Sequence, residues 1–383
     1  MMQFPIDTHS NGVYIVDNLK FVNKFDALSL ASKLNKDVYW NFNDAVFSSF
    51  DWTVPIEWSL PELYKQRAHQ LRDSYDYLSL FFSGGVDSTN ALHSFIDNNI
   101  FLDEIVMIRP YSSIKYANKL DKTGGNLWSE IEFAAIPYLK KQNINPKTLI
   151  RIIDMEESIT TFSSNSNLIQ QWNQLNYITP NFFAKNAICF NDKHWNALYT
   201  SGKTVGHITG TDKPIINVKN NNYSFQFNDV SVTIFHFDPT SSAAESEMIR
   251  KHQRHECFYW TPNFPTLVIK QCQVIKQLCE TDIIFKLLFS GKTRIQHEYA
   301  PINHYIYSPQ VNSIRTLFAA DKAPLSPNER HQRWIDNCPS KVLGLFKDVV
   351  NYSTQHISDR FFTTPTQNNA QKYKIFFSNI YKL

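Results

Sequence analysis

Hydrophobic and polar positions recur with different periods along the chain, and its beginning contains patterns of both strand and helix. Short apolar runs at 12–16 and 38–42 predict strands. Between them, 25–34 has the spacing of an amphipathic helix. A further helix is predicted over 59–72, where the first residue is a serine suited to be the N-cap and a proline stands in the first turn. Residues 1–74 are therefore expected to form a small α+β region.

From about residue 75 the pattern changes to short apolar runs that alternate with helical segments. The predicted strands are 77–82, 104–108, 148–153 and 207–209, and the predicted helices are 88–97, 127–142 and parts of 165–200. Strands that alternate with helices predict a parallel sheet wound on both faces, so residues 75–240 are expected to form a doubly wound α/β core. Ligands of such sheets bind at the carboxyl ends of the strands.

Beyond residue 215 the pattern changes again. The runs 215–219 and 223–227 are joined by three asparagines and predict a β-hairpin. A strand is predicted next, over 230–237. Residues 241–383 have a mostly helical pattern and are expected to form a separate C-terminal region.

Composition limits the class of protein. The chain has 383 residues, of which 43% are hydrophobic, enough for two or three domains. No apolar run approaches the roughly 20 residues that span a membrane, so no membrane partner is expected. The first residues lack a basic segment followed by an apolar one, and the five scattered cysteines include no C-x-x-C pair. Reduced thiols and a cytoplasmic location are therefore expected.

Charge and codon-related bias add little about partners. A net charge of +3 is too weak to argue for nucleic acid, although it does not exclude it. Only 10 glycines, beside many Asn, Lys, Ile, Phe and Tyr residues, suggest an AT-rich coding sequence. That composition suggests a phage or an AT-rich bacterium, and for a phage the expected location is the host cytoplasm.

The most informative stretch is Ser-Gly-Gly-Val-Asp-Ser at 83–88, between the predicted strand 77–82 and the predicted helix 88–97. A strand, a glycine-rich turn and a helix N-terminus form a phosphate cradle, because backbone N–H groups point outward and the helix end carries partial positive charge. Glycines let the backbone approach an anion closely. Hydroxyl groups add donors, and Asp87 is suited to hold a hard cation such as Mg²⁺.

This stretch resembles the PP-loop, S-G-G-x-D-S, of the ATP pyrophosphatase superfamily, which includes asparagine synthetase, GMP synthetase, NAD synthetase and several tRNA-modifying enzymes. The resemblance covers about residues 75–215 and implies a HUP-like core that binds ATP and Mg²⁺. Asp87 is implied to be a catalytic residue and a metal ligand. The implied nucleotide-binding residues of the loop are Ser83, Gly84, Gly85, Val86, Asp87 and Ser88. The structural alternative is an ordinary turn of small residues.

A second loop, 210–214, follows the predicted strand 207–209. PP-loop enzymes commonly place such a loop opposite the first, so the resemblance implies that Gly210 and Thr211 contact the nucleotide. It also implies that Asp212 helps to hold Mg²⁺. Lys213 is suited to neutralise the departing pyrophosphate as a mobile point charge. The alternative is a plain turn, since Gly, Asp and Pro are turn formers.

Further candidates lie at the second predicted strand and in the C-terminal region. By resemblance, Met107 and Ile108 line the adenine pocket, although Met in an apolar run also fits a core position. Arg109 is suited to meet a phosphate or an anionic substrate. The aromatic segment 256–260 either caps the nucleotide or packs at a domain boundary, and Lys270 after it is suited to reach the α-phosphate.

Two Gly-Lys-Thr triplets, at 202–204 and 291–293, do not fit a Walker A motif. That motif needs a glycine five residues before its Gly-Lys pair. Ala197 and Lys286 occupy those positions. The triplets therefore do not compete with 83–88 as a nucleotide site.

The resemblance implies adenylation, in which an oxygen of a small carboxylate or amide substrate attacks the α-phosphate of ATP and pyrophosphate leaves. Ammonia or an amine then displaces AMP, as in an asparagine synthetase-like C–N ligase. Residue 2 is Met, so no nucleophilic N-terminal Cys of a glutaminase domain is expected, and the amine is expected from solution or from a partner. Two alternatives stay open: a nucleobase- or tRNA-modifying PP-loop enzyme, and a non-catalytic nucleotide-binding module.

Overall fold

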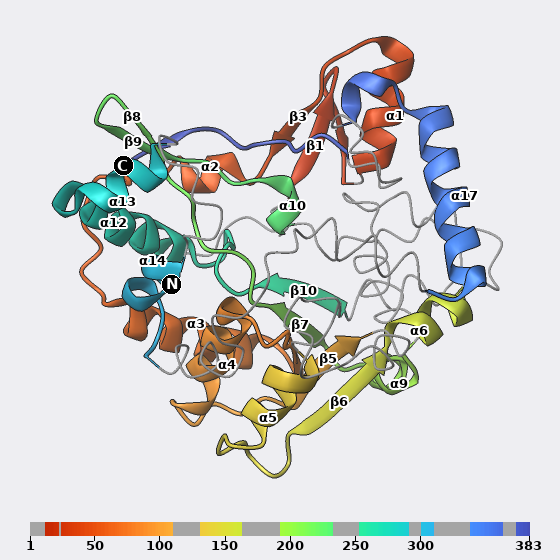
Figure 1. The fold of residues 1–383 in the computed structure, drawn as a ribbon, viewed down its shortest axis with the longest axis horizontal. Coiled ribbons are helices and arrows are strands. Elements are labelled where there is room, and N and C mark those ends of the chain that lie inside the picture. The colour runs from red at the N-terminus through yellow and green to blue at the C-terminus, as the bar shows by residue number, and fades with distance from the viewer. Residues whose placement is uncertain are drawn as a thin grey trace.

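The computed structural model of the chain is built around a five-stranded sheet with helices on both faces (Figure 1). It describes residues 12–22, 24–109, 131–162, 192–232, 253–290, 300–309, 338–362 and 373–383. The strands are all parallel and lie in the order β10 (Gln253–Cys257), β7 (Val205–Thr209), β4 (Tyr77–Phe81), β5 (Glu104–Arg109) and β6 (Leu149–Asp154). This confirms the predicted parallel α/β core and its four predicted strands.

Helices cover the two faces of the sheet. On one face, Arg67 of α3 (Leu60–Ser74) pairs with Glu256 of β10, and α4 (Val86–Ile96) packs against α3. On the other face, Trp195 of α9 (Lys193–Thr200) contacts Glu104 of β5. Every residue of the central strands β4 and β7 is buried, which is why the sequence has near-continuous apolar runs there.

A row of polar side chains crosses the sheet on the face that α9 covers. The strand register aligns four of them: His255, His207, Ser79 and Glu104. The hydroxyl oxygen of Tyr199 lies 2.8 Å from His207 Nε2, and the Trp195 indole N–H donates to Glu104 Oε2 at 2.6 Å. The aromatic side chains of α9 therefore supply hydrogen-bond partners to polar groups that are buried inside the protein.

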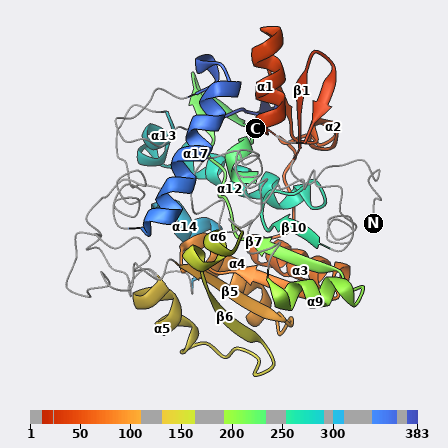
Figure 2. The same cartoon turned by 90° about the vertical axis from the view of Figure 1, so that its right-hand side faces the viewer.

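The N-terminal region forms a separate three-stranded antiparallel sheet, which lies above the central sheet in Figure 2. The predicted strand, helix and strand are present as β1 (Val13–Val16), α1 (Lys24–Leu34) and β3 (Tyr39–Asn41). The strand β2 (Leu19–Phe21) and the short helix α2 (Asp44–Phe47) are additional elements that the sequence pattern does not predict. α3 begins after Ser59, as predicted. The Ser59 backbone N–H donates to Glu62 Oε2 at 2.8 Å and the Glu62 N–H donates to Ser59 Oγ, a capping box.

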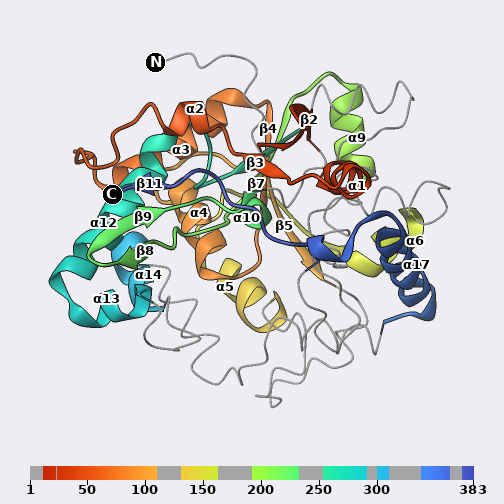
Figure 3. The ribbon, with the colours of Figure 1, turned by 90° about the horizontal axis from the view of Figure 1, so that it is seen from above.

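The predicted hairpin is present as β8 (Asn217–Lys219) and β9 (Asn222–Phe225). Its two turn residues, Asn220 and Asn221, have φ of 51° and 61°, as the tight hairpin turn requires. The end of the chain adds β11 (Tyr381–Lys382) beside β9, which Figure 3 shows from above.

The strand predicted over 230–237 is wrong in the part that the structure describes. Residues of this segment begin with a helical turn, α10 (Asp229–Val232). Asp229 is fully buried and bonded to Lys24 of α1 and to the backbone N–H of Phe376. These long-range contacts hold the turn and outweigh the strand preference of the alternating valines.

The C-terminal region is mostly helical where it is described, apart from β10, the short β11 and the irregular segments 258–264 and 373–380. Its helices are α12 (Pro265–Thr281), α13 (Ile283–Phe289), α14 (Ala300–Ile306) and α17 (Ser340–His356). α17 contacts both α1 and α6 (Met155–Phe162), and so joins the N-terminal region to the edge of the sheet at β6 (Figure 1). The central sheet thus takes a strand from a segment that was expected to be helical. Within the described residues, no helix is both long and apolar enough to cross a membrane.

Candidate functional site

The loop 83–85 connects β4 to the N-terminus of α4, in the strand–turn–helix arrangement that the sequence predicts. Gly84 has φ of 74°, a conformation that side chains disfavour. A Cβ atom at Gly84 would also stand only 2.9 Å from the Cβ of Ala135, at the end of η2 (Ile131–Ala135). Gly84 is therefore required both by the turn and by the segment that packs over it.

Hydroxyl groups fix the shape of this loop from the inside. The Gly85 N–H donates to Ser83 Oγ at 3.3 Å, and the hydroxyls of Ser88 and Thr89 donate to the Gly85 carbonyl at 3.0 and 2.9 Å. Ser83 and Gly85 are nevertheless exposed. The loop is thus internally bonded and open to solvent, so an anion can reach the N–H groups of the first turn of α4.

The second predicted loop touches the first one. It follows β7, which lies beside β4 in the sheet and runs parallel to it, so the loops 83–88 and 210–214 both begin at the carboxyl ends of these strands. The part of the sheet where these two loops lie is the loop edge. A Cβ atom at Gly210 would stand 2.8 Å from Ser88 Cα and 2.9 Å from the Asp87 carbonyl oxygen. Only a glycine lets the two backbones approach this closely.

Asp87 is the centre of the contacts between these loops. Lys213 Nζ donates to Asp87 Oδ1 at 3.0 Å, and the hydroxyl of Tyr307 donates to the same oxygen at 2.6 Å. The side chains of Asp87 and Lys213 are 23% and 12% exposed, so the pair is partly buried and still reached by solvent. The ammonium of Lys213 also lies 5.9 Å from the centre of the Tyr307 ring.

Two tyrosines of the C-terminal region complete the site: Tyr259, inside the aromatic segment 256–260 that is a candidate nucleotide cap, and Tyr307, which no sequence pattern indicates. The hydroxyl of Tyr259, just after β10, donates to the Asp87 carbonyl at 2.8 Å. Asn90 Nδ2 donates to that hydroxyl at 3.0 Å, while the Ser308 N–H donates to Asn90 Oδ1 at 2.9 Å. Asn90 therefore connects Tyr259 to the segment that carries Tyr307.

Both phenols remain protonated in this environment. Burial raises the pKa of Tyr307 and of Tyr259 well above the ordinary value, and the negative charge of Asp87 acts in the same direction. The two hydroxyls are therefore permanent hydrogen-bond donors to Asp87. The aromatic segment 256–260 thus contributes to the loop edge as well as to the core, where Phe258 and Trp260 are buried.

The remaining residues of the second loop lie around the same edge. Asp212 Oδ1 accepts a hydrogen bond from the Lys213 N–H at 2.7 Å. Thr211 Oγ1 is buried, and within the described part of the chain it has no hydrogen-bond partner. A buried hydroxyl without a partner is uncommon, and a ligand oxygen would satisfy it.

The other predicted site residues have their contacts outside the Asp87 cluster. Met107 and Ile108 are buried on β5, and Arg109 at its end forms an ion pair with Glu132 of η2. Lys270 Nζ donates to the Ile56 carbonyl at 2.7 Å, on the side of α12 that faces the N-terminal region. None of the contacts among the described residues joins Lys270 to the loop 83–88.

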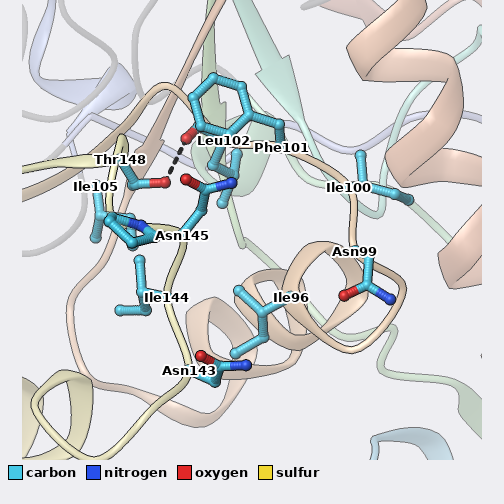
Figure 4. Close-up of a pocket in the computed structure, with 11 residues that line it drawn as sticks. Ile96, Asn99, Ile100, Phe101, Leu102, Ile105, Asn143, Ile144, Asn145 and Thr148 are labelled. Atoms are coloured by element: carbon cyan, nitrogen blue, oxygen red, sulfur yellow. Dashed lines mark hydrogen bonds between the residues drawn. The ribbon is translucent and has the colours of Figure 1, made fainter.

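A cavity of about 250 Å³ lies at the opposite end of the sheet, at the amino ends of β5 and β6 (Figure 4). Its lining includes Ile96 and Ile105, and Thr148 donates to the Leu102 carbonyl across it at 2.7 Å. It is thus separate from the edge where the two loops meet.

Among the described residues no three or more His, Cys, Asp and Glu side chains gather into a metal-binding group. Comparison with known proteins finds no matching family model, and it finds no matching curated protein.

Proposed function

We propose that this chain is a PP-loop ATP pyrophosphatase with a HUP-like core, which forms AMP and pyrophosphate from ATP while it activates a substrate oxygen. The observation that carries the proposal is the contact between the two strand-end loops, in which Lys213 reaches Asp87 at the N-terminus of α4. An open helix N-terminus, a carboxylate and a mobile ammonium at one edge of a parallel sheet suit a triphosphate.

Different residues of the site have different roles in this reaction. Backbone N–H groups of the loop 83–88 and the hydroxyl of Ser83 bind the β- and γ-phosphates. The ammonium of Lys213 moves from Asp87 to the departing pyrophosphate, where it stabilises the charge that builds up. Met107 and Ile108 offer an apolar strand end to the adenine, as the resemblance implies.

The loop edge also fits a bound cation. Among the described residues, both donors to the Asp87 carboxylate reach Oδ1, and the hydroxyl of Thr211 is without a partner. Asp87 and Asp212 would hold Mg²⁺, because carboxylate oxygens are its usual protein ligands. Bound Mg²⁺ would supply charge neutralisation to the phosphates.

An amide- or C–N-forming ligase of asparagine synthetase-like type is the form of this chemistry that we favour. The substrate would be a small molecule with a carboxylate or amide oxygen, and the nucleophile would be ammonia or an amine. The resemblance implies that the mostly helical C-terminal region provides the acceptor specificity.

The test is the release of pyrophosphate from ATP in the presence of Mg²⁺, with a panel of carboxylic acids and with ammonium or amines. The wild-type protein is expected to release pyrophosphate with at least one acceptor, and Asp87→Ala is expected to lose this activity. Asp97→Ala, at the other end of α4, is the matched control and should retain it. Activity only with added RNA would favour the nucleic-acid-modifying alternative, and no ATP binding by the wild-type protein would overturn the proposal.

A further inference from the structure

The carboxylate of Asp87 is held on one side only. The Tyr307 hydroxyl and the Lys213 ammonium both donate to Oδ1, at 2.6 and 3.0 Å. Among the described residues no side chain donates to Oδ2. Because the two oxygens of a carboxylate are otherwise equivalent, the donors on Oδ1 determine which oxygen is presented to a ligand.

The Tyr307 hydroxyl is itself held firmly. Tyr307 follows directly after α14, and the hydroxyl of Tyr64 of α3 donates to the carbonyl of Ile306, the last residue of that helix. Gln271 of α12 donates to the same Tyr64 hydroxyl at 3.0 Å. On the other side, Asn90 accepts from the Ser308 N–H. Three helices thus fix the residues on either side of Tyr307.

The two donors to Oδ1 differ in charge and in mobility. Lys213 is a cation on a flexible stem, so its presence opposes a second cation at Asp87, and in the proposed reaction it leaves for the pyrophosphate. Tyr307 is neutral and buried, and the segments on either side of it are hydrogen-bonded to other helices. When Lys213 leaves, Tyr307 remains as the donor that orients the carboxylate.

We infer that Tyr307 is a positioning residue for the cation site: its hydroxyl fixes Asp87 Oδ1 so that Oδ2 faces a Mg²⁺ ion that accompanies the nucleotide. This inference rests on the proposed function, because it takes the bound ligand to be a Mg²⁺–nucleotide. It assigns Tyr307 a role on the carboxylate, whereas Tyr259, which donates to the Asp87 carbonyl, supports the backbone.

The test measures binding and needs no turnover. α,β-Methylene-ATP, in which the bond between the α- and β-phosphates resists cleavage, is titrated calorimetrically in MgCl₂ and again in EDTA. The ratio of the two affinities reports how strongly the metal assists binding. Tyr307→Phe is expected to lower this ratio roughly tenfold or more, because a hydrogen bond to a charged group is lost. Binding in EDTA should change little.

Two further variants separate this role from a general structural one. Tyr14→Phe removes a tyrosine hydroxyl from the other Lys–Asp pair, the buried one at Asp229, and should leave the ratio unchanged. Lys213→Met is expected to raise the ratio, because it removes a competing cation and also a phosphate contact that acts without metal. Tyr307→Phe and Lys213→Met thus shift the ratio in opposite directions, although both remove a donor to the same oxygen.

An unchanged ratio for Tyr307→Phe would overturn the inference and leave the proposed function standing. Equal weakening in MgCl₂ and in EDTA would also overturn it, since that result describes a support for the whole loop. If Tyr307→Phe does not fold, Lys213→Met provides the test. The inference is then overturned if the ratio of the affinities in MgCl₂ and in EDTA does not rise in Lys213→Met. If the wild-type protein binds the analogue under neither condition, the proposed function falls and the inference falls with it.

Discussion

Two regions of the molecule contain the same three side chains in the same arrangement, with different surroundings. At the loop edge, Lys213 and Tyr307 donate to Asp87 Oδ1. Between the N-terminal region and the end of the chain, Lys24 and Tyr14 donate to Asp229 Oδ2, at 2.5 and 2.9 Å. Both lysines also lie against the ring of the tyrosine beside them.

The Asp229 pair is sealed and complete. The side chains of Lys24 and Asp229 are both 0% exposed, and the second carboxylate oxygen accepts the Phe376 N–H at 3.1 Å. Burial lowers the pKa of Lys24, and the charge of Asp229 partly offsets this. Both oxygens of this carboxylate are bonded within the protein and the side chain is fully buried, so the pair connects chain segments and is closed to a ligand from solvent.

The Asp87 pair is partly exposed and has one oxygen without a donor among the described residues. It also stands where two glycine-dependent loops leave the carboxyl ends of parallel strands. The types of side chain in a cluster therefore do not by themselves distinguish a binding site from a structural ion pair. Three other features distinguish the binding site: its partial exposure, the carboxylate oxygen without a donor, and its position at the strand ends.

The largest difference in stability is expected from removing the two aspartates. Asp229→Ala leaves Lys24 buried without its counter-charge and should lower the free energy of unfolding by about 3–5 kcal/mol. Asp87→Ala breaks a partly exposed pair and should lower it by no more than about 1 kcal/mol. Urea unfolding of both variants measures this. Equal losses would contradict the distinction between the two pairs.

The next largest effect is expected on catalysis. Lys213→Met should slow pyrophosphate release by about 10²–10³-fold, as expected when a group that stabilises transition-state charge is lost. Its unfolding free energy should stay close to that of the wild-type protein. The rate is measured under saturating ATP and MgCl₂. A variant that releases pyrophosphate at the wild-type rate would show that Lys213 has no part in the reaction.

Three glycines test how the loop edge is assembled. Gly84→Ala meets both a left-handed φ and the Cβ of Ala135, Gly210→Ala meets the Ser88 backbone, and Gly202→Ala meets its φ of 82° alone, with nothing within 4 Å. Overpacking costs about 1–3 kcal/mol. Gly84→Ala should therefore lower the melting temperature and the affinity for nucleotide most. Gly202→Ala should lower only the melting temperature, and loss of nucleotide affinity in this control would contradict the account.

The smallest effect is expected on the pH dependence of stability, through His207. This histidine belongs to the polar row that crosses the sheet and, like the Asp229 pair, is fully buried. Burial lowers the pKa of His207 well below its ordinary value, and electrostatic interactions with His255 and Arg151 act in the same direction. Below about pH 6.5 the unfolded chain therefore binds a proton that the folded chain does not. As the pH is lowered further, the free energy of unfolding decreases by at most about 1.4 kcal/mol per pH unit. His207→Gln should reduce this slope in urea unfolding. An equal slope in both proteins would exclude His207 as its source.

The sequence was sufficient for the features that local pattern encodes. The loop 83–88, the strand before it, the helix after it and the capping box at Ser59 all follow from spacing and side-chain type. β10 could not be found in this way, because its residues are polar: Glu256 pairs with Arg67 of α3, and His255 stacks on His207. A strand whose polar side chains find partners on distant elements has no apolar period that the sequence could reveal.

The missed residues of the site have a related cause. Tyr307 and Tyr259 reach Asp87 from 220 and 172 residues away in sequence. A tyrosine after a helix or a strand carries no local sign of such a contact. A reliable prediction of β10 would have placed Tyr259 at the same sheet edge as the loop 83–88, but Tyr307 depends on the packing of α14 against α3 and α12.

The most direct test of the account is the binding of α,β-methylene-ATP in MgCl₂ to the wild-type protein and to Asp87→Asn, which keeps the shape of the side chain and removes its charge. The account predicts that the wild-type protein binds the analogue and that Asp87→Asn loses the part of the affinity that depends on Mg²⁺, with an unchanged urea midpoint. Equal Mg²⁺-dependent binding by both proteins would contradict the claim that Asp87 holds the cation at the loop edge.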